Sequence, residues 1–172
     1  YILGSSTDSA HVAAQMGLPY AFASHFAPTH LFEALEIYHR EFRSSQFLDE
    51  PYTMAGINVI AADTDEEAKR LSTSMIRMML GVMTNNIDYL QAPEEFTKEF
   101  EDLLANPSFQ RMTKYAFIGS QETVQRQTLD FIERTAVNEV IIGSNIYDPQ
   151  ARIRSIEIFA EAMKAINEGC TV

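Results

Sequence analysis

Short apolar runs alternate with amphipathic stretches along this chain, and each kind of stretch predicts one kind of element. Apolar runs bounded by Gly, Pro or polar residues are typical of strands, whereas apolar residues at spacings of three and four are typical of helices. The predicted strands cover residues 2–3, 20–26, 54–62 and 139–143. The predicted helices cover residues 7–16, 30–43, 66–80, 121–135 and 149–168. The chain therefore reads as a series of strand–helix units.

The residues at the helix ends support these bounds. Gly17 suits the left-handed position that follows a helix, and Thr64 with Glu67 forms a capping box. Ser120 precedes the fourth helix, and Asp148 precedes the last, where the next residue is a proline. We expect each of these residues to stabilise a helix terminus.

The spacing of apolar residues also predicts which side of a helix is buried. The expected buried residues of the first helix are Val12, Ala13 and Met16. Those of the last helix are Ile153, Ile156, Phe159, Ala160 and Met163.

The four predicted strands lack polar alternation and are separated by helices, which favours a parallel sheet covered on both faces. Two α/β architectures fit this pattern: a small doubly wound sheet, or half of an eight-stranded barrel. Residues 85–114 depart from it, with a short helical pattern over 94–104, a break at Asn106-Pro107 and no evident strand. We interpret 85–114 as an insertion within a single domain of residues 1–172.

Composition excludes several classes of protein. A net charge of -11 and a pI near 4.7 oppose binding to the phosphates of nucleic acid. No apolar run approaches the length of about 18 residues that a membrane helix needs. Cys170 is the single cysteine, which excludes a disulfide framework and indicates a reducing, cytoplasmic setting.

Neither a metal site nor a natural N-terminus is evident in the sequence. The four histidines, His11, His25, His30 and His39, share no spacing typical of metal ligands. The chain begins at Tyr1, already inside a predicted strand, whereas natural chains usually begin with a few dispensable residues. We therefore expect it to be a fragment that lacks an N-terminal part.

The turn between the first strand and the first helix is the strongest candidate for a binding site. The first N–H groups of a helix have no internal partner and carry partial positive charge, so they attract phosphate. Ser5, Ser6 and Ser9 add hydroxyl donors, and Gly4 has no Cβ to hold a ligand away from the backbone. From the residues alone a second reading stays open, in which Ser6 with Asp8 and Ser9 simply caps the helix.

His25 is a weaker candidate. It follows the second predicted strand, at the end where barrel enzymes carry their active sites. Both a catalytic role and a purely structural hydrogen bond at the loop fit this position.

Four segments in this order carry a resemblance to a known family: residues 4–22 (GSSTDSAHVAAQMGLPYAF), 58–71 (NVIAADTDEEAKRL), 117–125 (FIGSQETVQ) and 139–148 (EVIIGSNIYD). Together they resemble the C-terminal half of the bacterial luciferase-like flavin monooxygenases, over essentially the whole chain. The resemblance implies a (βα)8 TIM barrel in which the predicted strands are the fifth to eighth. It also implies that Ser6 and Ser9 hold the phosphate of FMN, with Ser5 supplying backbone and Gly4 completing the turn.

The implied reaction uses FMN reduced by a separate flavin reductase, together with O2 and a small organic substrate. The chain has no tryptophan, whereas the family has tryptophans near the flavin where Ser24, His25 and Phe26 stand here. An aldehyde substrate and light emission are therefore not expected. The family's basic phosphate partner and its histidine lie in the N-terminal half. No catalytic residue is assigned to this chain, and we expect it to be inactive alone.

Two alternatives remain at this point. A half-barrel with exposed strand edges could be a non-catalytic flavin-binding or interaction protein that pairs as a homodimer. Its interface would be the methionine-rich helix with Met75, Met78, Met79 and Met83. Alternatively, a deazaflavin replaces FMN, because related barrels use the same phosphate turn.

Overall fold

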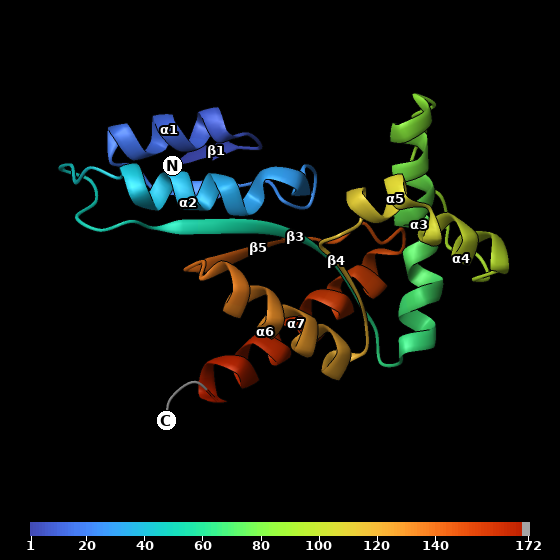
Figure 1. Cartoon of the computed structure of the whole chain (residues 1–172). Coiled ribbons are helices and arrows are strands. Elements are labelled where there is room, and N and C mark those ends of the chain that lie inside the picture. The colour runs from blue at the N-terminus through green and yellow to red at the C-terminus, as the bar shows by residue number, and fades with distance from the viewer. Residues whose placement is uncertain (170–172) are drawn as a thin grey trace. The chain divides into compact units, whose positions relative to one another are not determined.

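The computed structural model describes residues 1–169, which form two compact units (Figure 1). The first unit comprises residues 1–57, 111–115 and 132–143. The second comprises residues 58–110, 116–131 and those from 144 onward. Cys170 lies outside the described residues.

The first unit contains four strands, one of them in part, and two whole helices. Its elements are β1 (Ile2–Gly4), α1 (Thr7–Met16), β2 (Tyr20–Phe22), a 3-10 turn at Pro28–His30, α2 (Leu31–Glu41), the first part of β3 (Thr53–Ala61), and β5 (Glu139–Gly143). Leu3 lies opposite Ala21, and Ala21 opposite Met54, in parallel register. β5 also pairs with β3. Helices α1 and α2 pack side by side (Figure 1).

The second unit continues β3 and adds α3 (Asp65–Thr84), α4 (Lys98–Ala105), α5 (Pro107–Met112), β4 (Ala116–Gly119), most of α6 (Gln121–Thr135) and α7 (Pro149–Gly169). Val59 of β3 lies opposite Phe117 of β4 in parallel register. Strand β4 was not predicted from the sequence. It has only four residues, too few to stand out as an apolar run.

The strongest local signals predicted the elements well. Strand β3 is buried at every residue, as its apolar run predicts. Strand β2 is shorter than expected because the chain turns after Phe22, where the Phe26 N–H donates to the Ala23 carbonyl at 3.1 Å. Full burial of the sheet was a wrong expectation for β1 and β5, since Leu3 and Ile141 are exposed.

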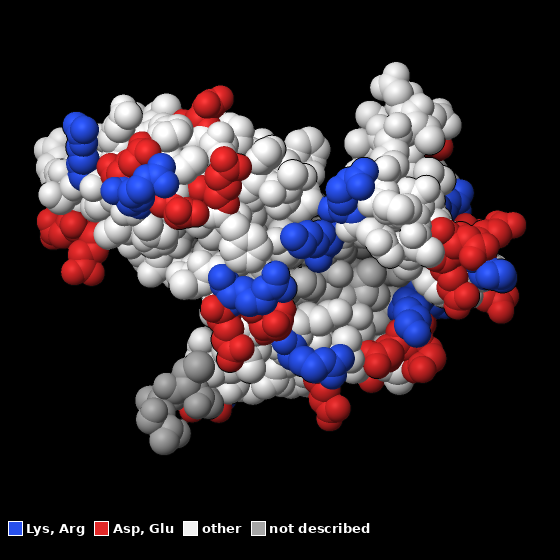
Figure 2. Space-filling model, in the orientation of Figure 1, with Lys and Arg blue, Asp and Glu red and all other residues white. Residues whose placement is uncertain are grey.

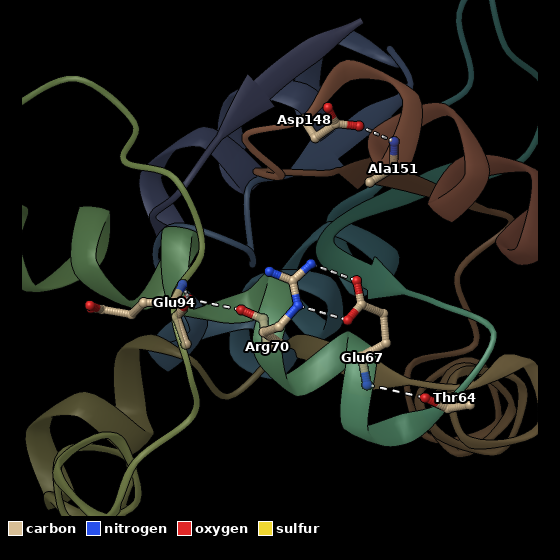
Figure 3. Close-up of polar contacts among 7 residues, drawn as sticks. Thr64, Glu67, Arg70, Glu94, Asp148 and Ala151 are labelled. Carbon is tan, nitrogen blue, oxygen red and sulfur yellow. Dashed lines mark hydrogen bonds and ion pairs between the residues drawn. The ribbon is translucent and has the colours of Figure 1, made fainter.

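Two of the predicted helix caps of the second unit, Thr64 and Asp148, are present (Figure 3). The Glu67 N–H donates to the Thr64 hydroxyl at 3.1 Å, while the Glu67 carboxylate pairs with Arg70. The Ala151 N–H donates to the Asp148 carboxylate at 2.8 Å. Thr64 is therefore the predicted cap of α3, but Glu67 does not complete the reciprocal half of a capping box.

The predicted buried face of α1 was only partly right. Ala13 is buried, but Val12 and Met16 are 47% and 54% exposed, and Ala10 and Ala14 are buried in their place. Small residues face α2 because the two helices approach closely, as shown by the bond from the Arg43 N–H to the Ala14 carbonyl. Close approach of backbones favours alanine over larger apolar side chains.

The predicted buried face of α7 was largely wrong. Ile153, Ile156 and Ala160 are exposed, whereas Phe159 is buried as expected. The buried face also contains Ser155, whose hydroxyl accepts the Ala61 N–H at 2.8 Å. This serine satisfies a backbone group of β3 inside the protein. A search for apolar spacing alone excludes such a residue.

Asp65 joins two parts of the second unit. Its contacts predict how the stability of the protein changes at acid pH. The Ser120 N–H donates to its carboxylate at 2.6 Å, and the Thr123 hydroxyl donates at 3.3 Å. The backbone bond from Ser120, followed by the hydroxyls of Thr123 and Ser120, lowers the pKa of Asp65. The ionised form is thus favoured in the folded state. Its stabilising effect is present above the pKa that Asp65 has in the unfolded chain. The effect is lost as the pH falls through the lower pKa of Asp65 in the folded protein.

We therefore expect Asp65→Asn to flatten the decline in stability below about pH 4, while lowering stability at neutral pH. Urea midpoints measured from neutral to acid pH test this expectation. Glu66→Gln, which alters an exposed carboxylate in the same helical turn, is the matched control and should keep the wild-type pH profile. An Asp65→Asn variant that loses the same stability at every pH would contradict the assignment.

Candidate phosphate-binding turn

The candidate site is the turn that links β1 to α1 in the first unit. Ser5 and Ser6 occupy the turn, and both are exposed. Ser6 is the N-cap residue, with extended backbone angles of φ -138° and ψ 165°. The bond from the Ala23 N–H to the Gly4 carbonyl fixes the end of β1 beside the end of β2. The first turn of α1 is thereby held at the carboxyl ends of two parallel strands.

The Ser6 hydroxyl is not used as a helix cap. Within residues 1–169, it makes no capping hydrogen bond to the first turn of α1. The side chain and the helix N–H groups are therefore both available to an acceptor from outside. Of the two readings from the sequence, simple capping by Ser6 does not describe this geometry.

The sequence around the turn supplies no positively charged side chain, so the backbone provides the partial positive charge there. Asp8 lies in the first turn of α1, and the first Lys or Arg in the sequence is Arg40. An anion at this turn would be held by N–H groups, hydroxyls and the helix dipole rather than by a neighbouring basic residue in sequence. On the face in Figure 2, Lys and Arg side chains are scattered among Asp and Glu.

Ser9 lies in the first turn of α1 and bonds back to the turn before the helix. Its hydroxyl donates to the Ser6 carbonyl at 2.6 Å. The Tyr20 hydroxyl lies 3.0 Å from the Ser9 Oγ and donates to the same Ser6 carbonyl at 3.2 Å. The structure therefore brings together Gly4, Ser5, Ser6 and Ser9 and adds Tyr20.

Gly4 has a different role from the one expected. A Cβ at this position would overlap the Ser9 side chain. The space that was expected to admit a ligand is occupied by Ser9, because the strand and the helix approach closely here. Gly4 thus permits the bond between Ser9 and the Ser6 carbonyl.

The sequence pattern did not identify Tyr20 as part of the site. It opens β2 and was counted only as a strand residue, yet it is completely buried with its hydroxyl on the turn. Burial raises the pKa of Tyr20, and the bond with Ser9 partly opposes this rise. The hydroxyl is therefore protonated at neutral pH. The signal that could have identified Tyr20 is that a tyrosine in a buried strand needs a hydrogen-bond partner for its hydroxyl.

His25 lies in the loop after β2, beside β3. A Cβ at Gly56 would overlap its imidazole ring, so glycine at this position makes room for the histidine. Ser24 precedes it, is fully buried and donates to the Gly56 carbonyl. Burial lowers the pKa of His25, which favours the neutral ring at neutral pH. A catalytic role for His25 stays a prediction.

The other histidines have separate surroundings. His11 lies 2.6 Å from Glu41, and His30 lies 3.2 Å from Glu33. Across residues 1–169, no cluster of His, Cys, Asp and Glu is suited to a metal ion. In the same residues, no helix has the length and apolar character needed to cross a membrane.

The sequence relatives of this chain include luciferase-like monooxygenases. The family model for luciferase-like monooxygenases matches residues 1–139. The luciferase-like monooxygenase of Escherichia coli K12 is 36% identical over 158 residues, which cover 92% of this chain and 47% of that protein. Protein YddN of Bacillus subtilis strain 168 is 39% identical over 163 residues, covering 95% of this chain and 48% of that protein. The chain spans about half the length of these relatives.

Solved structures give the same result. Apo-MsnO8 superposes with a TM-score of 0.83 and 30% identity, covering 94% of this chain and 49% of that one. The FMN complex of the oxygenating constituent of 3,6-diketocamphane monooxygenase from Pseudomonas putida has a TM-score of 0.59 at 21% identity, with coverage of 91% and 45%. The second likeness bears on the fold alone. These neighbours are luciferase-like TIM-barrel proteins, so the expected parallel α/β fold is confirmed.

The matched residues 1–139 include the whole candidate turn, with its strand and helix. Family model, sequence relatives and solved structures agree, and the chain belongs to the luciferase-like monooxygenase family.

Proposed function

We propose that this chain supplies the flavin-phosphate site of an FMN-dependent monooxygenase. Membership of the family supports an oxidoreductase activity. One observation carries the assignment of the turn: the Ser6 hydroxyl is exposed at a helix N-terminus and makes no cap bond within the described chain. A dianionic phosphate accepts hydrogen bonds, and this turn presents donors.

The residues of the turn fit the phosphate in distinct ways. The N–H groups of the first turn of α1 point along the helix dipole toward an anion. The exposed hydroxyls of Ser5 and Ser6 add donors, and Ser9 adds a third if its proton leaves the Ser6 carbonyl. Gly4 keeps Ser9 close to the turn. When bound, reduced flavin would supply the electrons that activate O2 toward a small organic substrate.

The remaining parts of the proposal concern the whole protein. The relatives are about twice as long as this chain, so we assign the chemistry on O2 and substrate to the other half of the family fold. The isolated chain is then inactive but able to bind flavin phosphate. A flavin reductase and a homodimeric state complete the proposal, and we place the protein in the cytoplasm.

The two alternatives from the sequence differ in how well the structure and the comparisons support them. A dimer through the methionine-rich helix is less favoured, because Met75 and Met79 are buried in the second unit and only Met83 is exposed. A deazaflavin has more support, since the coenzyme F420-dependent reductase from Methanopyrus kandleri shares the fold with a TM-score of 0.53 at 12% identity. Both cofactors carry a phosphate, so the turn alone does not distinguish them.

Titration of the chain with FMN, riboflavin and coenzyme F420 tests this function, with flavin fluorescence as the signal. FMN should bind at least about tenfold more tightly than riboflavin, because only FMN places a charged acceptor in the turn. F420 bound more tightly than FMN would select the deazaflavin alternative. Equal affinity for FMN and riboflavin, or binding of neither, would overturn the proposed site.

A further inference from the structure

We infer that Tyr20 is a positioning residue for the flavin phosphate, because its hydroxyl can hold the Ser6 carbonyl while the Ser9 proton turns to the ligand. This inference rests on the proposed function. It concerns a residue outside the serine-rich turn, and it assigns separate tasks to two hydroxyls that share one carbonyl.

Two hydroxyl protons compete for the Ser6 carbonyl. Ser9 and Tyr20 each have one hydroxyl proton, and both oxygens lie within bonding distance of the Ser6 carbonyl, at 2.6 and 3.2 Å. The two hydroxyls are also 3.0 Å apart. The carbonyl has two lone pairs, and as the N-cap carbonyl of α1 it also accepts the first backbone bond of the helix. One of the two protons is therefore redundant in the structure as it stands.

A bound phosphate can take the hydrogen bond of the redundant proton. Its oxygens only accept, so Ser9 can contact it only by donating its proton. Without Tyr20, that rotation would remove the side-chain hydrogen bonds to the Ser6 carbonyl and add a cost to binding. With Tyr20 in place, the carbonyl keeps a hydrogen bond, because the single Tyr20 proton stays on it while the Ser9 proton turns to the ligand.

Packing holds the Tyr20 hydroxyl in this position. Its ring is fully buried, with centroids 5.4 Å from Tyr38 and 6.3 Å from Phe22. Its N–H donates to the Tyr52 carbonyl at 2.9 Å, which fixes the backbone at the start of β2. The neighbouring Tyr38 hydroxyl bonds elsewhere, donating to the Leu18 carbonyl at 3.0 Å. Tyr20 is thus a rigid donor, whereas Ser9 has a short side chain that can rotate.

The test compares Tyr20→Phe, Ser9→Ala and the double variant by FMN and riboflavin titration. Tyr20→Phe should weaken FMN about three- to tenfold and leave riboflavin within about twofold, because only FMN requires the Ser9 proton. The double variant should bind FMN no more weakly than Ser9→Ala alone, since Tyr20 acts through Ser9.

Tyr38→Phe is the matched control. It removes a buried hydroxyl from the same ring cluster, one that bonds to Leu18 and Tyr52 rather than to the turn. It should lower the melting temperature without changing the ratio of FMN to riboflavin affinity. A Tyr20→Phe variant that behaves in the same way would overturn the inference.

A measurement on the wild-type chain keeps the inference testable if Tyr20→Phe does not fold. With tyrosine labelled with 13C at Cζ, FMN should shift the Tyr20 resonance and riboflavin should leave it unchanged. An unchanged resonance with bound FMN contradicts the role of Tyr20 alone. If wild-type protein shows no preference for FMN over riboflavin, the proposed function fails and this inference fails with it.

Discussion

Replacing Ser6 with alanine is expected to weaken FMN binding by about 1–2 kcal/mol, or about five- to thirtyfold, and to leave riboflavin binding unchanged. Ser6 is exposed, and its hydroxyl makes no cap bond to α1 within the described residues. Its removal therefore leaves no internal donor or acceptor unsatisfied. Ser6→Ala should therefore lower the affinity for FMN without lowering the stability of the fold. Fluorescence titration with both flavins measures this loss of affinity.

Ser44→Ala is the matched control for this experiment. Ser44 is an exposed serine of the first unit that lies between α2 and β3, outside the turn. It should bind both flavins as wild type does. The melting temperatures of both variants should stay close to that of wild type. An equal loss of FMN and riboflavin affinity in Ser6→Ala would show that the hydroxyl does not act on the phosphate.

Gly17→Ala is expected to have the largest effect on stability, about 2–4 kcal/mol. Gly17 ends α1 with φ at 58°, in the left-handed region that disfavours any residue with a Cβ. A Cβ there would also overlap the Arg43 carbonyl and lie 2.6 Å from the Ser45 Cβ. A backbone carbonyl cannot rotate away as a side chain can, so both costs apply. Urea unfolding measures the loss.

Ala136→Gly is the control with the opposite change, because it removes a Cβ at a left-handed position instead of adding one. Ala136 is exposed in the first unit and has φ at 52°, so it already carries the cost of a Cβ in the left-handed region. Glycine at this position should raise the urea midpoint or leave it unchanged. A Gly17→Ala variant as stable as wild type would mean that α1 and α2 do not approach as closely as described.

Predictions from the sequence succeeded where the physical signal was local. The bounds of α1 follow from a serine before the helix and a glycine after it, and β3 follows from one uninterrupted apolar run. The turn that carries Ser5 and Ser6 was predicted for the same reason. Each of these features depends on residues that are neighbours in the chain.

Predictions failed where distant residues determine the outcome. Ser155 is buried in α7 because it bonds to Ala61, 94 residues earlier, and no helical period reveals such a partner. Ala10 and Ala14 replace Val12 and Met16 on the buried face of α1 because α2 lies so close.

The candidate site was incomplete for the same reason. Tyr20 reaches the Ser6 carbonyl from 14 residues away, across the pairing of β1 with β2. Its hydroxyl joins the turn only once that register is formed. The serines could therefore be assigned from the sequence, whereas their buried partner could not.

Chemical-shift mapping tests the central claim most directly. In 15N-labelled chain, FMN should shift the amide resonances of Ser5, Ser6 and Thr7 more than any others, because these N–H groups lie at the turn and the start of α1. Riboflavin should leave the same resonances nearly unchanged. If the largest FMN shifts arise outside the turn, or if both flavins shift it equally, this turn does not bind the flavin phosphate.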